Sequence, residues 1–181
     1  DNGYAWGEHW YHKKNCAYEE CALVPLIILD PRHPQNGRRV DVMTLNVDLA
    51  TTFADLAGVQ IPPEAKVNGL SLKGLIQGTA DALPRDRVII ECWGGGAKGP
   101  DTQAAARSNR WKYVEHYDDD ARTILHIRAD TREEIEFYDL QKDPYELDNL
   151  AWLTPQELQT KGYAAGEVET AMDEMQAALL Q

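Results

Sequence analysis

The sequence predicts a mixed fold, α/β in its first part and α+β in the chain taken as a whole. Short apolar segments follow one another between residues 87 and 140 with no helical pattern between them, which favours an antiparallel sheet. Ahead of them, one continuous apolar segment is followed by a helix. We therefore divide the chain into residues 1–80, which end an α/β domain, and residues 81–181, a small antiparallel sheet packed with a helix.

One strand and one helix are clear in the first part. Residues 24–29 are apolar without interruption and are followed by a turn, which predicts a strand buried on both faces. Residues 46–57 carry apolar side chains at helical spacing. Asn46 or Asp48 is expected to cap the start of this helix, and Gly58 to end it.

The second part alternates strands and turns before a final helix. Residues 156–180 are mainly helical, and their last stretch carries an apolar stripe that we expect to pack on the sheet. The expected strands cover residues 87–93, 104–107, 111–116, 123–128 and 135–140.

Charge and composition exclude several functions. The chain has 181 residues, and 30 acidic residues against 18 basic ones give it a net charge of −12. Such a surface disfavours binding to nucleic acid phosphates and to anionic membranes. No apolar run reaches the roughly 18 residues of a membrane span. The odd number of cysteines, Cys16, Cys21 and Cys92, argues against a disulfide framework, and we expect three small, partly buried residues.

Polar side chains suited to chemistry gather near the start of the chain. Asp1 and Asn2 offer a carboxylate and an amide oxygen, ligands that Ca²⁺ or Mg²⁺ prefers, although Asp-Asn-Gly is also an ordinary turn sequence. His9 and Lys14 could line an anion pocket, with lysine as a point charge and histidine as a hydrogen-bond or proton donor. The same residues are also typical of a solvated surface.

Five segments of the sequence, in this order, favour a chemical role for these residues over an ordinary turn and surface. Together they resemble the type I sulfatases of the alkaline-phosphatase superfamily. The first combines Asp1-Asn2-Gly3, Gly7-Glu8-His9, Lys14 and Val24-Pro25; the others are residues 47–58, residues 69–78, the segment Arg107 to Val114 with its Lys-Tyr pair, and residues 136–150 with Asp-Pro-x-Glu.

The resemblance implies roles for particular residues. Asp1 and Asn2 would bind an active-site calcium ion, Lys14 would bind the sulfate oxygens, and His9 would face the same pocket. His9 and Lys14 are thus the expected catalytic and substrate-binding residues. The family nucleophile is a formylglycine made from a Cys/Ser-x-Pro-x-Arg motif, and no such motif occurs in these 181 residues.

We therefore expect the carboxyl-terminal portion of a longer sulfatase, inactive alone and with an incomplete calcium site. It would hold the end of a sulfatase-type α/β sandwich domain and a small carboxyl-terminal subdomain. The expected partners are a small sulfated sugar or aryl sulfate and the upstream part of the same protein. The apolar edge of residues 24–29 would favour self-association. The resemblance also implies a periplasmic, secreted or lysosomal location.

Two alternatives stay open at this point. A phosphonate monoester or phosphodiester hydrolase of the same superfamily would share the metal motif. A non-catalytic binding module would explain the missing nucleophile.

Overall fold

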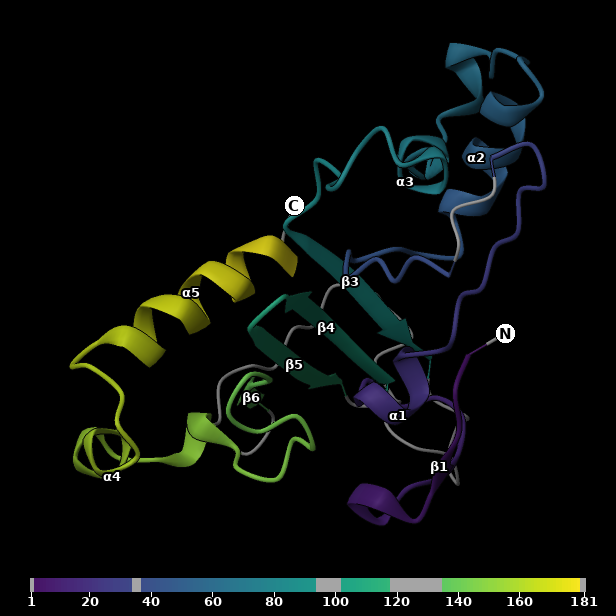
Figure 1. Ribbon diagram of the computed structural model, residues 1–181. Helices are drawn as coiled ribbons and strands as arrows, with labels where there is room; N and C mark the ends of the chain where they lie inside the picture. The colour runs from purple at the N-terminus through teal and green to yellow at the C-terminus, as the bar shows by residue number, and fades with distance from the viewer. Residues whose placement is uncertain (1, 34–36, 94–101, 118–134, 180–181) are drawn as a thin grey trace. The chain divides into compact units, whose positions relative to one another are not determined.

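The computed structural model describes residues 2–33, 37–93, 102–117 and 135–179 (Figure 1). The chain forms two compact units, one of Asp1–Pro25 with Arg87–Gln181 and the other of Leu26–Asp86. The first 25 residues thus belong with the carboxyl-terminal sheet. The division of the longer protein after residue 80 stays a prediction.

The first unit is built on a four-stranded antiparallel sheet. Its strands are β3 (Arg87–Cys92), β4 (Thr102–Ser108), β5 (Trp111–Tyr117) and β6 (Ile135–Asp139), paired in chain order. The mixed fold and the antiparallel sheet are confirmed, and four of the five expected strands are found. The fifth, at residues 123–128, lies outside the described residues.

Helix α5 (Glu167–Leu179) packs on one face of this sheet, against β4 and β5. The apolar stripe predicted for this helix is the face that is buried against the sheet. The core on this face consists of Ala106, Tyr113, Phe137, Leu150, Ala151, Tyr163, Val168, Ala171 and Met175. The 3₁₀ turn η4 (Leu150–Trp152) and helix α4 (Pro155–Thr160) lead into α5, and a Thr154–Glu157 capping box starts α4.

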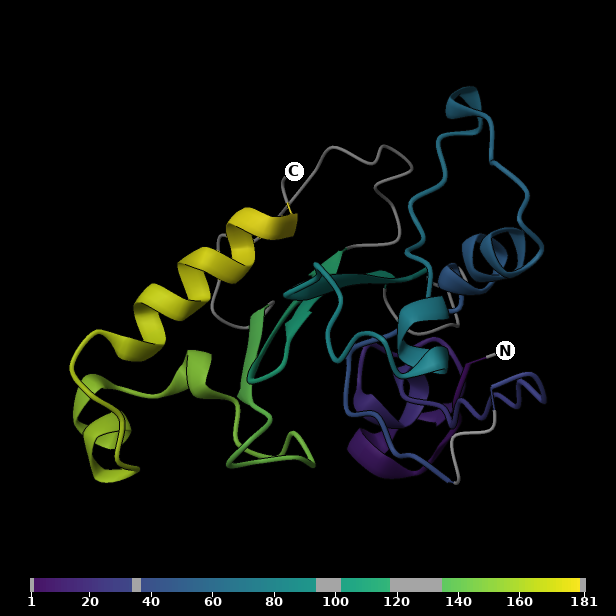
Figure 2. The ribbon, with the colours of Figure 1, turned by 45° about the horizontal axis from the view of Figure 1, so that its top comes forward.

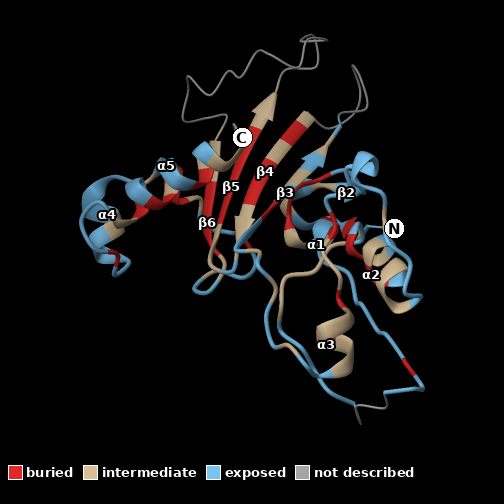
Figure 3. Cartoon of the chain, turned by 90° about the horizontal axis from the view of Figure 1, so that it is seen from above, coloured by how far each residue is buried: buried red, intermediate tan, exposed pale blue. Residues whose placement is uncertain are grey.

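The amino-terminal segment covers the opposite face of the sheet. Neighbouring strand residues point to opposite faces, so Ala105 and Val114 face away from α5 and pack against Ala17. In Figures 1 and 2 the sheet lies between α5 and this segment. Figure 3 shows buried residues along β4, β5 and β6, as expected for strands covered on both sides.

The amino-terminal segment is a small hairpin followed by one helical turn. Strands β1 (Ala5–Trp6) and β2 (His12–Lys13) pair antiparallel across the 3₁₀ turn η1 (Glu8–Trp10), and helix α1 (Glu19–Ala22) follows. A disulfide joins Cys16 to Cys21, with a sulfur–sulfur distance of 2.03 Å. Both cysteines are buried, as expected, but their pairing corrects the prediction of unpaired residues; Cys92 is free.

The second unit contains helix α2 (Asp48–Leu56), the 3₁₀ turn η2 (Pro63–Ala65) and helix α3 (Lys73–Gln77). The expected helix is confirmed, but neither Asn46 nor Asp48 caps it. The buried Asp48 carboxylate instead binds both arms of the Arg85 guanidinium at 2.7 Å and accepts the backbone N–H groups of Leu45 and Leu70. Asp48 therefore ties the loops around α2 together.

The strand expected at residues 24–29 does not form, and that prediction is wrong. The segment has no strand pairing, and Ile27 and Leu29 are 92% and 83% exposed. A strand buried on both faces needs a neighbouring strand to pair with and a layer of structure packed over each face. None of the described strands pairs with this segment.

No helix among the described residues is long and apolar enough to cross a membrane.

Candidate functional site

The residues expected to carry chemistry lie on the hairpin and the loop that follows it. Ala5 pairs with Lys13, so Asn2 and Lys14 belong to the open end of the hairpin, and His9 lies in the connection at the other end. Asn2 and Lys14 are exposed. Asp1 lies outside the described residues. Asn2 and Lys14 thus lie outside the paired strands, on the side away from the connection that carries His9.

Gly3 holds the Asp-Asn-Gly motif against helix α1. Its N–H donates to the Cys21 carbonyl at 2.7 Å, and a Cβ added to it would lie 2.0 Å from the Glu20 carbonyl oxygen. Only glycine permits so close an approach of two backbones. The position of Asn2 is therefore set by its neighbour's contact with α1.

The donor set at this end fits a hard cation as far as it is described. Asn2 offers an amide oxygen on a backbone that Gly3 fixes, and Asp1, which precedes it, lies outside the described residues. Carboxylate and amide oxygens suit Ca²⁺.

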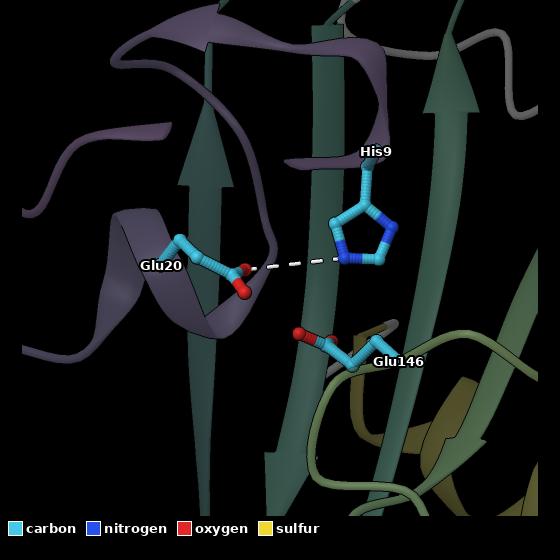
Figure 4. A group of neighbouring side chains, drawn as sticks. All are labelled: His9, Glu20 and Glu146. Carbon is cyan, nitrogen blue, oxygen red and sulfur yellow. Dashed lines mark ion pairs between the residues drawn. The ribbon is translucent and has the colours of Figure 1, made fainter. Parts of the chain in front are cut away.

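His9 is held in a fixed orientation. Its ring stacks on Tyr18 with centroids 3.8 Å apart and planes 9° apart, and only 11% of its side chain is exposed. The Tyr18 hydroxyl in turn donates to Glu136 at 2.9 Å. Burial and the adjacent Glu136 carboxylate raise the pKa of Tyr18 far above its ordinary value, so Tyr18 stays neutral. Nε2 of His9 faces Glu20 at 3.9 Å (Figure 4).

A buried charge cluster joins helix α1 to strands β4 and β5 and to the loop after β6. The ammonium of Lys112, on β5, is fully buried and lies 2.7 Å from Glu146 and 2.8 Å from Glu19. Arg107, on β4, binds Glu19 at 3.0 Å. The second oxygen of Glu146 accepts the backbone N–H of Glu19 at 2.7 Å, so a residue 127 positions away anchors the first turn of α1.

The two carboxyl groups of this cluster shift in opposite directions. Burial raises the pKa of Glu146, and the attraction of Lys112 does not fully offset it. Burial also acts to raise the pKa of Glu19, but Lys112 and Arg107 outweigh it and lower that pKa. Glu19 is therefore firmly ionised, and Glu146 is the group more easily protonated.

Sequence reasoning missed the cluster, although two of its members lie in segments that had been singled out. Lys112 and Glu146 belong to the Lys-Tyr and Asp-Pro-x-Glu segments that carry the family resemblance. A useful signal was present: Lys112 interrupts the apolar run Trp-Lys-Tyr-Val, where a solvated lysine would be out of place. Glu20, the neighbour of His9, gave no comparable signal.

Comparison with known proteins shows which family this chain is similar to. Residues 7–161 match the family model described as N-sulphoglucosamine sulphohydrolase, C-terminal. An N-acetylglucosamine-6-O-sulfatase of Bacteroides thetaiotaomicron is 31% identical over 160 residues, which cover 83% of this chain and 25% of that protein. Arylsulfatase K of Xenopus laevis is 29% identical over 164 residues, 88% of this chain and 28% of that protein.

A solved structure agrees with the sequence comparison. The structure of BT4656 in complex with its substrate D-glucosamine-2-N,6-O-disulfate matches with a TM-score of 0.71 and 27% identity, over 96% of this chain and 32% of that one. The chain spans about a quarter of the length of these two curated relatives.

Proposed function

Because the chain belongs to the sulfatase family, as its carboxyl-terminal portion, we propose that it forms part of an enzyme that hydrolyses sulfate esters. The observation that carries the proposal is the match of residues 7–161 to the sulfatase family model. Asn2 precedes and Lys14 follows the paired strands of the hairpin, and Gly3 and the Cys16–Cys21 disulfide restrain the backbone next to them. These two residues would supply an oxygen ligand and a positive charge.

The chemistry of sulfate-ester cleavage needs these two groups. Negative charge grows on the sulfuryl oxygens and on the leaving oxygen, and groups already aimed at them lower the barrier. Lys14 would bind the sulfuryl oxygens. Asp1 and Asn2 would hold calcium, which when bound supplies a further positive charge. The role of His9 as proton donor to the leaving oxygen stays a prediction, since its Nε2 faces Glu20.

The formylglycine nucleophile would come from residues outside these 181. The proposal therefore includes the expectation that the chain alone does not turn over sulfate esters.

We propose a sulfated amino sugar as the substrate class. The support comes from relatives: one is an N-acetylglucosamine-6-O-sulfatase and one solved structure holds a glucosamine disulfate. No observation favours the phosphonate or phosphodiester alternative or the non-catalytic module, and both are outcomes of the test below.

An oxidising compartment also forms part of the proposal. The Cys16–Cys21 disulfide supports a periplasmic, secreted or lysosomal location, because cytosolic thiols are kept reduced. Peptide mapping of the native protein under non-reducing conditions should recover residues 16 and 21 in one cross-linked peptide. Recovery of two free thiols would count against this location.

The activity test compares two adjacent lysines in the native protein. Its size is first measured in the source cells with an antibody against this chain. We expect the purified native protein to hydrolyse N-acetylglucosamine 6-sulfate in preference to phosphate mono- and diesters. Lys14→Gln should lower kcat/KM by about 100-fold or more, whereas Lys13→Gln should change it by less than about threefold. Preference for a phosphodiester, no activity at all, or equal effects of the two variants would refute the proposal.

A further inference from the structure

His9, Glu20 and Glu146 form a compact group that the proposed sulfatase chemistry does not use in full. One ligand atom from each, an imidazole nitrogen and two carboxylate oxygens, lies within 4.8 Å of the others. Figure 4 shows the three side chains converging from the hairpin, from α1 and from the loop after β6. All three belong to the first compact unit.

The surroundings of Glu20 are the main evidence that the group binds a ligand. Its Oε2 is buried and has no hydrogen-bond partner in the described part of the chain. Nε2 of His9 is 3.9 Å away, too far for a hydrogen bond. A buried carboxylate oxygen without a partner is costly and rare in native proteins, and a bound ion is one of the few arrangements that explains it.

The spacing is slightly wider than that of two ligands of one tetrahedral ion. Zinc–nitrogen and zinc–oxygen bonds are about 2.0–2.2 Å long, so two ligands at the tetrahedral angle lie about 3.5 Å apart. The His9–Glu20 distance of 3.9 Å would shorten by about 0.4 Å on binding. The group as a whole, whose ligand atoms lie within 4.8 Å of one another, would close by at most about 1.3 Å.

The three carboxylates of this region meet different partners. Glu19 and Glu146 pair with the cations Arg107 and Lys112, whereas Glu20 faces the His9 ring at 3.9 Å. The Glu146 carboxylate keeps a free lone pair on each oxygen after its contacts with Lys112 and the Glu19 N–H.

Neighbouring contacts hold two of the three ligands in place. Tyr18 stacks on His9 and fixes the ring, and the Glu19 N–H fixes Glu146. Outer contacts of this kind are what orient ligands in metal sites.

We propose that Nε2 of His9 and the carboxylates of Glu20 and Glu146 hold a divalent transition-metal ion. One imidazole with two carboxylates suits Zn²⁺ better than Ca²⁺, which prefers oxygen ligands alone. The site would tie the hairpin, α1 and the loop after β6 together. It makes His9 a ligand in place of the proton donor that the family resemblance implies, and it does not depend on sulfatase activity.

The test is metal binding to the purified, chelator-treated native protein that contains this chain. We expect titration calorimetry to show one Zn²⁺ per chain, bound at least about tenfold more tightly than Ca²⁺. His9→Ala and Glu20→Gln should each weaken Zn²⁺ binding by about tenfold or more. His12→Ala, which removes an exposed histidine from the same hairpin, should change it by less than about twofold.

A spectroscopic measurement guards against variants that fold poorly. Glu20→Gln keeps the shape of the side chain, and circular dichroism must match the parent before its binding is compared. Co²⁺ in place of Zn²⁺ should give visible absorption bands in the parent that are lost in Glu20→Gln. Unchanged Zn²⁺ affinity in both variants, equal loss in His12→Ala, or no Zn²⁺ binding at all would overturn the proposal.

Discussion

Replacing Lys112 by Met tests whether the buried charge cluster holds the first unit together. Lys112 and Glu146 are both completely buried, and their charged atoms lie 2.7 Å apart. The variant has nearly the same shape but leaves Glu146 without its cation, whereas Glu19 keeps Arg107 at 3.0 Å. Removing one partner of a buried pair costs about 3–5 kcal/mol, a large part of the roughly 5–15 kcal/mol that keeps a domain folded.

The expected loss depends on pH, with a definite sign. The folded-state pKa of Glu146 is already raised above the ordinary value of 4.5 by burial, and loss of Lys112 raises it further. A carboxyl group with a raised folded pKa destabilises the fold as pH rises above its unfolded pKa. The variant should therefore be closest to the parent near pH 4.5 and furthest from it at pH 8.

Native-state hydrogen exchange at the amides of β4 and β5 measures the effect in the first unit alone. Lys161→Met is the matched control, since its ion pair with Asp148 is 2.6 Å long but exposed and should contribute less than about 1 kcal/mol. The double variant Lys112→Met, Glu146→Gln should recover part of the loss by removing the stranded charge. A cost below about 1 kcal/mol for Lys112→Met, equal to that of the control, would refute this account of the cluster.

Three further predictions follow from contacts described above. Gly3→Ala places a methyl group 2.0 Å from the Glu20 carbonyl oxygen and should lower the melting temperature clearly, whereas a neutral result would show that the two backbones separate easily. Replacing Cys16 and Cys21 by Ser should cost about 2 kcal/mol in denaturant unfolding, and the parent should lose the same amount in reducing agent; no loss in either would mean that the disulfide is dispensable. Burial acts to raise the pKa of Asp48, but its Arg85 and backbone partners outweigh burial and lower that pKa below 3.8. The second unit should therefore lose stability only as pH falls below about 4. A loss of protection of the α2 amides in hydrogen exchange that begins near pH 6 would contradict this.

The sequence predicted best those elements whose pattern is local. The two short strands around the Ser108–Asn109 turn and the apolar stripe of the last helix pack against each other, so the local patterns agree with the packing. The helix from Asp48 was found for the same reason. Its caps were not, because the Asp48 carboxylate binds Arg85, 37 residues away, and no local pattern reveals that partner.

Long-range pairings account for the rest. Residues 24–29 read as a strand from their apolarity, but strand formation depends on neighbours that no described segment supplies. The prediction of unpaired cysteines depends on the odd number of cysteines in the chain. That number does not show that Cys16 and Cys21 come together when α1 forms. In the candidate site the residue types near His9 and Lys14 were visible, whereas Glu20 and Glu146 become neighbours only when residues more than 100 positions apart meet.

The second unit interrupts the first, and this has a consequence for synthesis on the ribosome. Residues 1–25 are among the first of this chain to emerge, but their anchors come much later: Gln103 for Ala17, and Glu146 for Glu19. Domains generally fold in the order in which they are made. Here the second unit can fold before the hairpin has its anchors. The loop bearing Lys14 takes its final form only after residue 146 has left the exit tunnel.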